Sequence, residues 1–294
     1  MNGKPAIGII GAGIVGAATG KGFHKLGHDV SFYDISKQKM SYLENQGYCV
    51  AQNIDEIVSN NDISFVCVNT PSKDGRQDLS QVTSVLVELP RAINAAERNH
   101  MIVFRSTMLP GTMRDNVVSY LDRHCCKKRG RDYNVCYNPE FFRQETAAND
   151  FLNPDRVVIG EDLDRSSFVL EQVYRNLTDQ IIITSFEAAE MIKYASNCFL
   201  ALKISFFNEV WMMCKQLRIN DKDVSLGASL DKRIGEYGTK MGLPFGGNCL
   251  PKDTEAMVSF AEKLSIRQDL LKVILEINKE LESFMQQSQQ LQRL

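Results

Sequence analysis

The sequence lacks the features that mark secreted, membrane-spanning or nucleic-acid-binding proteins. No apolar run in its 294 residues approaches the ~18 residues of a membrane span. Residues 1–5 include no apolar segment of a signal peptide, so we expect no secretion signal. The formal net charge is only −2, so we expect a small-molecule substrate, and neither a nucleic acid nor a membrane as partner.

Paired cysteines are also missing. The eight cysteines are scattered without a CxxC pair, and the adjacent Cys125 and Cys126 are poorly spaced for a tetrahedral zinc site, so we expect no metal. A chain of this length without a secretion signal favours reduced thiols and a cytoplasmic location. Each cysteine is therefore either a packing residue or a candidate nucleophile.

What the sequence does contain is a regular alternation of short apolar runs and helical segments. Because the chain is 44% hydrophobic, it can bury one large core or two moderate ones. Strands alternating with helices predict an α/β fold with a Rossmann-type, doubly wound parallel sheet. The expected strands are residues 6–10, 30–34, 63–68, 101–104, 135–137, 156–160 and 181–183, with helices around 36–46 and 79–96.

The character of the sequence changes after Thr184. Residues 186–217 include no proline or glycine, and apolar residues recur there at helical spacing. A helix this long far exceeds the usual ~11–12 residues and needs burial along its length. We expect the same helix of a second subunit to cover it, which predicts a homodimer. The sequence thus predicts a Rossmann domain, residues 1–185, and an all-α central domain, residues 186–294.

A glycine turn in the first predicted domain indicates a dinucleotide site. Gly11, Gly13 and Gly16, with Ile14 and Val15 between them, directly follow a strand and open a helix. Glycines there permit a tight turn, close approach to a pyrophosphate and close helix packing, and the helix N-terminus supplies amide donors.

The acid expected to read the ribose is Asp34. It lies about twenty residues after the turn, at the end of the second strand, where a carboxylate accepts both ribose hydroxyls and repels a 2′-phosphate. NAD is therefore the expected cofactor. Lys39 either reaches over the adenine-side ribose or is an ordinary surface lysine.

The second predicted domain holds the strongest catalytic signal. Cys249 lies between Gly246-Gly247-Asn248 and Leu250-Pro251-Lys252-Asp253, in a stretch that follows the glycine-rich residues 235–247. The glycines let the backbone crowd a ligand, and a nearby ammonium favours the thiolate. This pattern predicts a nucleophilic cysteine.

These residues resemble the UDP-glucose/GDP-mannose dehydrogenase family. Further matching motifs run in family order over nearly the whole chain: Asn69-Thr70-Pro71, Ser106-Thr107, Asn138-Pro139-Glu140-Phe141, Asn153-Pro154-Asp155-Arg156, Lys193-Tyr194-Ala195-Ser196-Asn197 and Asp231-Lys232-Arg233-Ile234-Gly235. The family oxidises the C6 alcohol of a nucleotide sugar twice, with two NAD⁺. The resemblance implies that Cys249 forms a thiohemiacetal and then a thioester, which water hydrolyses.

The resemblance also implies roles for other residues. Lys193 and Asn197, one helical turn apart, would stabilise developing oxyanions, and Glu140 would act as a base in thioester hydrolysis. Asp253 would orient the lysine and water, and Thr107 would position water. Cofactor contacts are implied for Thr70, Pro71, Ser106, Gln144 and Lys252, and substrate contacts for Phe141, Phe142, Phe245, Gly246 and Arg233, the last in the neighbouring subunit's site.

Two departures from the family pattern leave the substrate open. Gln144 stands where the family usually has a glutamate, which removes a charge near the cofactor. Family members usually run on into a third domain that holds the substrate's nucleotide, whereas this sequence ends soon after Asn278. We therefore expect a short form, natural or truncated, that acts on a nucleotide sugar or a smaller relative.

Two other functions stay open from the sequence alone. A two-electron β-hydroxyacid-type dehydrogenase has a related fold and a similar Lys-x-x-x-Asn helix motif, but needs no nucleophilic cysteine. A non-catalytic NAD-binding subunit would fit the missing third domain, but would have no use for a thiol in a glycine-walled loop.

Overall fold

The computed structural model describes residues 3–73 and 75–291, without the side chains of residues 73 and 282–291. The chain divides into two compact units. Unit 1 comprises Met1–Pro71 and Asp78–Lys193, and unit 2 comprises Ser72–Gln77 and Tyr194–Leu294. The domain boundary after residue 185 stays a prediction, because one long helix runs from the first unit into the second.

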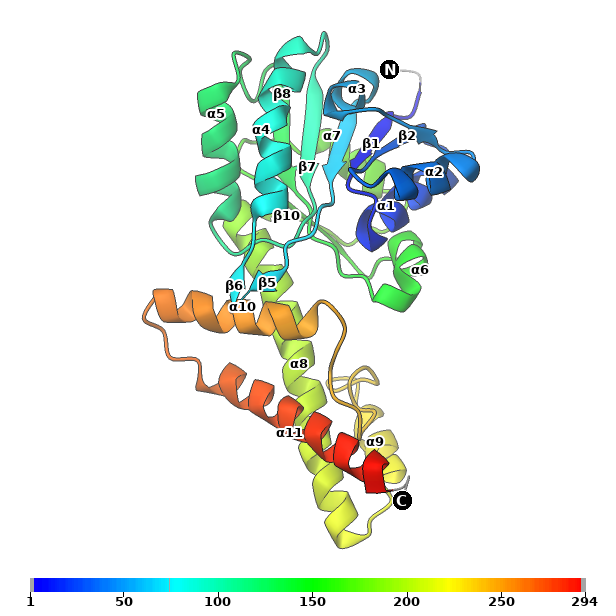
Figure 1. The fold of residues 1–294 in the computed structure, drawn as a ribbon, viewed down its shortest axis with the longest axis vertical. Coiled ribbons are helices and arrows are strands. Elements are labelled where there is room, and N and C mark those ends of the chain that lie inside the picture. The colour runs from blue at the N-terminus through cyan, green and yellow to red at the C-terminus, as the bar shows by residue number, and fades with distance from the viewer. Residues whose placement is uncertain (1–2, 74, 292–294) are drawn as a thin grey trace. The chain divides into compact units, whose positions relative to one another are not determined.

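An eight-stranded sheet forms the centre of unit 1 (Figure 1). Its strands lie in the order β10-β9-β8-β7-β4-β1-β2-β3. Their bounds are β1 (Ile7–Ile10), β2 (Val30–Tyr33), β3 (Cys49–Val50), β4 (Ile63–Val66), β7 (His100–Phe104), β8 (Tyr133–Tyr137), β9 (Val157–Glu161) and β10 (Ile181–Ser185). The chain order reverses at β1, which pairs with both β2 and β4. Dinucleotides bind at such a switch point, so the Rossmann-type prediction is confirmed.

Helices cover both faces of this sheet. The helical elements are α1 (Ile14–Lys25), α2 (Lys37–Asn45), α3 (Ile54–Asn60), α4 (Ser80–Ala95), the π-helix η1 (Met113–Val118), α5 (Ser119–His124), the 3₁₀ turn η2 (Gln144–Thr146), α6 (Ala147–Leu152) and α7 (Phe168–Tyr174). Successive strand residues point to opposite faces. Accordingly, Val66 packs with α3, α4 and α5, whereas Phe65 packs with α1, α6 and α7. Figure 1 shows α4 and α5 side by side on one face.

One strand pair departs from the predicted parallel sheet. β9 runs antiparallel to β8, with Tyr137 paired to Gly160. The connection between the two strands includes α6, which packs on α1, and the chain re-enters the sheet without a crossover. A parallel pair would need that crossover.

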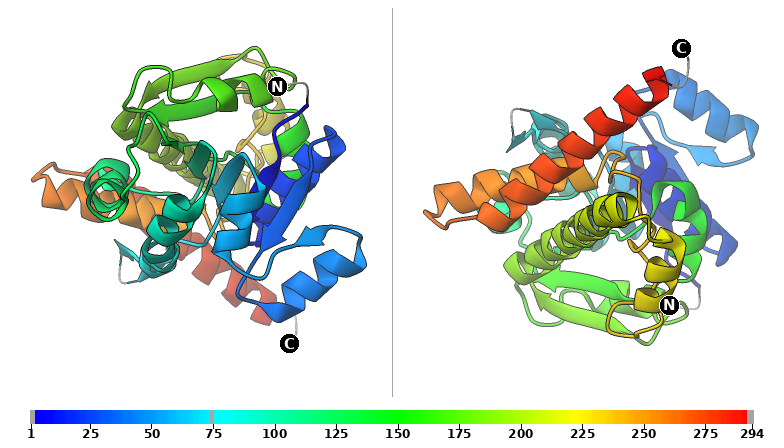
Figure 2. Two further views of the ribbon diagram at one scale, coloured as in Figure 1. Left: turned by 90° about the horizontal axis from the view of Figure 1, so that it is seen from above. Right: turned by 90° about the horizontal axis from the view of Figure 1, so that it is seen from below.

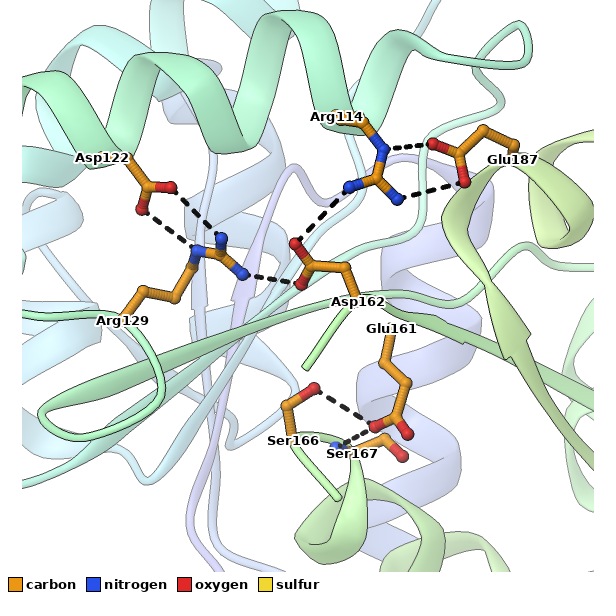
Figure 3. Close-up of polar contacts among 8 residues, drawn as sticks. All are labelled: Arg114, Asp122, Arg129, Glu161, Asp162, Ser166, Ser167 and Glu187. Carbon is orange, nitrogen blue, oxygen red and sulfur yellow. Dashed lines mark hydrogen bonds and ion pairs between the residues drawn. The ribbon is translucent and has the colours of Figure 1, made fainter. Parts of the chain in front are cut away.

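A network of ion pairs joins the start of the long helix to the rest of unit 1 (Figure 3). Arg114 pairs with Glu187 at 2.5 Å and with Asp162 at 4.0 Å. Arg129 pairs with Asp162 at 2.6 Å and with Asp122 at 3.0 Å. Arg129 and Asp162 have side chains only 12% and 8% exposed, so this part of the network is shielded from solvent.

The described part of unit 2 consists of helices, one small hairpin and an irregular segment over residues 230–249. Its elements are β5 (Ser72–Lys73), β6 (Arg76–Gln77), the part of α8 (Phe186–Leu217) that follows Lys193, α9 (Asp221–Ser229), α10 (Leu250–Lys263) and α11 (Asp269–Leu291). Figure 2 shows α10 beside the start of α11. Cys198, Ala201, Phe245, Leu271 and Ile274 form the buried core. The 32-residue α8 confirms the predicted long helix. Among the described residues, no helix is long and apolar enough to cross a membrane.

Candidate active site

The glycine turn has the geometry that a dinucleotide requires. Gly11 has φ +96°, and a Cβ on Gly16 would lie 1.9 Å from the Gly11 carbonyl oxygen, so neither position accepts a side chain. A Cβ on Gly13 would have no atom within 4 Å. Because Gly13 faces open space at the start of α1, a pyrophosphate can approach the backbone there. Ile14 is exposed and Val15 half-buried in the first turn of this helix.

Asp34 is fixed beside the same turn. Its carboxylate accepts hydrogen bonds from the backbone N–H of Ala12 and Ser36, each at 2.8 Å, and from Lys39 Nζ at 2.9 Å. Burial opposes ionisation, but these three donors outweigh it and hold the pKa of Asp34 below its ordinary value. Lys39 thus forms an ion pair with Asp34, the residue expected to bind the ribose, and its own side chain is 46% exposed.

The ends of β4 and β7 place the next expected residues together. The Thr70 hydroxyl donates to the Thr107 carbonyl at 2.7 Å, and the Ser106 hydroxyl donates to the Val68 carbonyl at 2.6 Å. These bonds join the two segments that follow neighbouring parallel strands. Ligands bind at this carboxyl edge in doubly wound sheets, so the segments are suitably placed for cofactor contacts. Pro71 is exposed next to them.

Glu140 and Lys193 form a buried ion pair in unit 1. Lys193 Nζ donates to Glu140 Oε1 at 3.0 Å and to the Glu140 carbonyl at 2.5 Å, and the two side chains are only 2% and 6% exposed. Phe142 N–H donates to Glu140 Oε2 at 2.6 Å. Burial works against ionisation, but Lys193 and the Phe142 amide outweigh it, so the pKa of Glu140 is lowered. A carboxylate and an ammonium are therefore held ready at one place.

The residues after Glu140 differ in their surroundings. The Phe141 ring lies 3.9 Å from the Arg156 guanidinium and 5.4 Å from Lys193 Nζ, both measured to the ring centroid. Phe142 is half-buried, and Gln144 is exposed at the start of η2. The ring of Phe141 thus lies against two cations.

In unit 2, Cys249 is exposed and is the N-cap residue of α10. Its side chain makes no capping hydrogen bond, and α10 continues for 14 residues beyond it. A helix N-terminus is the end at which a helix stabilises negative charge. In contrast, burial raises the pKa of Cys67 and of Cys198 to about 12 each. Cys198 and Cys214 are buried in α8, as packing residues are.

The loop before Cys249 is held by two asparagines that no motif in the sequence marks as site residues. Asn208 of α8 accepts from Gly242 N–H at 2.9 Å and donates to the Leu243 carbonyl at 2.8 Å. Asn278 of α11 accepts from Phe245 N–H at 2.7 Å and donates to the Phe245 carbonyl at 2.9 Å. Phe245 is buried in the apolar core of unit 2, whereas Gly246 is exposed. An amide within an otherwise apolar helical stretch is the only sequence signal for such a clamp.

A polar set lies on the first turn of α10. Asp253, 1% exposed, accepts from Asn197 Nδ2 at 2.6 Å and from Lys252 Nζ at 2.5 Å. Asn197 lies one turn after Lys193 in α8, as the spacing predicts. Asp253 thus fixes the amide of Asn197. Arg233 is 88% exposed and pairs with Asp231 at 2.6 Å.

The doubly wound sheet, the glycine turn and Asp34 together define the class of this protein as a Rossmann-type dinucleotide-binding protein. Two family models match the chain: the NAD-binding domain of the UDP-glucose/GDP-mannose dehydrogenase family over residues 42–178, and the central domain of the same family over residues 187–280.

Similar proteins agree with these models. UDP-glucose 6-dehydrogenase of Rickettsia bellii is 36% identical over 95% of this chain and 68% of its own length. GDP-mannose 6-dehydrogenase of Pseudomonas putida is 35% identical over 92% and 67%. The solved UDP-glucose dehydrogenase of Pyrobaculum islandicum has a TM-score of 0.87 at 34% identity, over 95% of this chain and 69% of that one. The chain belongs to the UDP-glucose/GDP-mannose dehydrogenase family and spans about two thirds of the length of these relatives.

Proposed function

We propose that this protein oxidises the primary alcohol of a nucleotide sugar, such as UDP-glucose or GDP-mannose, to a carboxylate, with Cys249 as the covalent nucleophile. The observation behind this proposal is the exposed Cys249 thiol at the N-terminus of α10. The reaction consumes one alcohol, two NAD⁺ and one water, and releases one carboxylate, two NADH and three protons.

Unit 1 supplies the proposed cofactor site. Amides of the turn at Gly11, Gly13 and Gly16 would hold the pyrophosphate, with Ile14 and Val15 beside it, and Asp34 would accept the ribose hydroxyls. Further contacts are proposed for Lys39, Thr70, Pro71, Ser106 and Gln144, and from unit 2 for Lys252. When bound, NAD⁺ accepts the hydride that leaves the sugar carbon.

Cys249 would act on the aldehyde that the first oxidation leaves. Its thiolate adds to the aldehyde carbon, a C–S bond forms, and the oxygen becomes an alkoxide that can lose a second hydride. The Lys193 ammonium and the Asn197 amide would stabilise that alkoxide. Their partners Glu140 and Asp253 restrain both side chains.

Water would then release the acid from the resulting thioester. Glu140, kept ionised by its partners, would take a proton from the water as its oxygen bonds to the carbonyl carbon. The C–S bond breaks and the thiolate of Cys249 leaves. Thr107 would position this water, and Asp253 would orient the water and the lysine.

A second copy of the chain is part of the proposal. Phe199, Phe206 and Met213 recur every seven residues along α8 and are 62%, 55% and 56% exposed. Such a stripe matches the helix-to-helix contact of a homodimer. Arg233 would reach the substrate of the neighbouring subunit, while Phe141, Phe142, Phe245 and Gly246 contact the subunit's own substrate. A cytoplasmic location stays part of the proposal.

The stoichiometry of NADH tests this function. Purified protein is supplied with UDP-glucose, GDP-mannose or small hydroxymethyl compounds, and NADH is counted per molecule consumed. We expect two NADH and one carboxylate from a nucleotide sugar, whereas one NADH and a ketone or aldehyde product would support a two-electron dehydrogenase instead.

The role of Cys249 is tested separately with a serine variant. Cys249→Ser should still bind NAD⁺ and should lose acid formation by at least about a thousandfold, because the alcohol is a far poorer nucleophile. Cys126→Ser, which alters another exposed cysteine, is the matched control and should keep full activity. Acid formation by Cys249→Ser at the normal rate would rule out the covalent route.

A further inference from the structure

Arg105 is a buried cation at the end of β7, directly before the Ser106-Thr107 segment. Only 4% of it is exposed. Its Nη1 donates to the Tyr174 hydroxyl at 3.0 Å, to the Asn138 carbonyl at 3.4 Å and to the Asn138 side-chain oxygen. All of these acceptors are neutral, so hydrogen bonding alone does not balance the buried charge.

The contacts of Arg105 fix the start of the Asn-Pro-Glu-Phe segment. Asn138 Nδ2 donates to the Val158 carbonyl at 2.7 Å, and Asn138 N–H donates to the Phe104 carbonyl at 2.8 Å. The Tyr174 hydroxyl donates to Asn138 Oδ1 at 2.7 Å. Asn138 is therefore held through its backbone and both side-chain polar atoms, two residues before Glu140.

The charged and titratable groups that face Glu140 come from three segments of the chain. Lys193 of α8 forms the ion pair, and Arg105 adds an attraction that lowers the pKa of Glu140 further. Cys67, which follows β4, is neutral, because burial raises its pKa to about 12. Two cations therefore act on one carboxylate. The Arg105 guanidinium in turn lies 5.0 Å from the centroid of the Phe142 ring.

We propose that Arg105 is a positioning residue of the hydrolytic step: it locks Asn138 in place and, by its charge, keeps the Glu140 carboxylate ionised beside Lys193. It acts through Glu140 and touches no reacting atom. Because a base works only when deprotonated, loss of this charge should make Glu140 harder to ionise and shift acid formation toward higher pH. This inference rests on the proposed function.

Four variants separate the charge of Arg105 from its structural contribution. In Arg105→Met, the acidic limb of the pH profile of kcat should move up by a fraction of a pH unit, because the smallest of the attractions that lower the pKa of Glu140 has been removed. Arg105→Lys, which keeps the charge, should restore most of that shift. Tyr174→Phe and the matched control Arg129→Met should lower the Tm but leave the limb in place. Arg129 is a half-buried arginine, 12% exposed in its side chain and paired with Asp122 and Asp162 (Figure 3). The proposal would be overturned if the acidic limb of the pH profile did not move in Arg105→Met, or if it moved equally in Arg129→Met.

A double-mutant cycle tests the same coupling without turnover, so its failure can be told apart from failure of the proposed function. The Tm is measured for the unfolding transition that NAD⁺ raises, in Arg105→Met, Glu140→Gln and the double variant. We expect the two losses to be non-additive by roughly 3 °C. The cycle of Arg129→Met with Glu140→Gln should be additive. Additivity in the Arg105 cycle would contradict the inference even if the enzyme proved fully active.

Discussion

Two glycine-rich segments of this protein hold their shape by different means. In the turn at residues 11–16, backbone atoms exclude a side chain at Gly16, since a Cβ there would lie 1.9 Å from the Gly11 oxygen. In the loop at residues 235–247, Gly246 and Gly247 face open space, and the amides of Asn208 and Asn278 fix the loop instead. The first segment is specified by its own sequence, whereas the second depends on side chains elsewhere in unit 2.

The largest effect should come from a methyl group in the first segment. Gly16→Ala should abolish measurable NAD⁺ binding and destabilise unit 1 by ~3 kcal/mol, because the new Cβ collides with backbone. Gly13→Ala should fold normally and lose NAD⁺ affinity alone, since its Cβ meets no protein atom. Calorimetric binding and Tm measurements compare the two. Equal destabilisation by both variants would show that crowding by the backbone does not shape this turn.

A smaller effect is expected at the second segment. Asn278→Ala leaves Phe245 N–H and C=O unpaired in a buried place and should destabilise unit 2 by about 2 kcal/mol. The loop would also lose its anchor, so the alkylation rate of Cys249 by iodoacetamide should change. Asn208→Ala is the parallel variant on α8. If neither variant alters alkylation or Tm, the loop does not depend on these amides.

Asp34 tests the ribose side of the first segment. Asp34→Ala removes the proposed acceptor of the ribose hydroxyls and the partner of Ala12 N–H. NAD⁺ affinity should fall about tenfold, equivalent to about 1.4 kcal/mol. Lys39→Ala, which alters an exposed partner of the same carboxylate, should change affinity much less. If Asp34→Ala binds NAD⁺ with unchanged affinity, the ribose does not bind at Asp34.

A third turn, at Gly111, differs from both segments because an ionisable side chain, that of Glu190, fixes its backbone. Glu190 of α8 accepts from Gly111 N–H and Met113 N–H, both at 2.7 Å. Burial raises the pKa of Glu190 to about 8, with Glu187 and Asp115 adding to the rise. A raised folded-state pKa favours the protonated form, so stability is fully present below about pH 4.5 and declines as pH rises toward 8.

The smallest predicted effect is therefore a gradual change of the Tm with pH. Between pH 4.5 and about pH 8, the ordinary and the raised pKa of Glu190, the Tm of the transition that NAD⁺ raises should fall by a few degrees. Glu190→Gln should flatten that slope. An identical slope in both proteins would assign the pH dependence to other groups.

Elements that their own local sequence specifies are the ones that the sequence predicts well. Short apolar runs correspond to β1, β4 and β7, and the stretch without proline or glycine corresponds to α8. The sequence did not predict β3, α3 or the β5–β6 hairpin, because strands of two residues and a helix of seven leave no periodic pattern.

The residues of the site likewise divide into those that a local motif identifies and those that it does not. Motif residues such as Asp34 and Cys249 can be named from local spacing, since the chemistry and the turn belong to one segment. Arg105, Asn208 and Asn278 could not, because each acts on backbone or charge that is distant in sequence. A polar residue in an apolar stretch is a signal of burial but does not identify its partner.

The proposed covalent role of Cys249 is tested most directly by trapping the sugar on the protein. Glu140→Gln should slow thioester hydrolysis, so this variant is mixed with NAD⁺ and UDP-glucose or GDP-mannose, quenched in acid and digested. Mass spectrometry of the peptide that includes Cys249 should show an acyl adduct that hydroxylamine removes, accompanied by two NADH per adduct. Two NADH per substrate with no adduct on Cys249 would contradict the account.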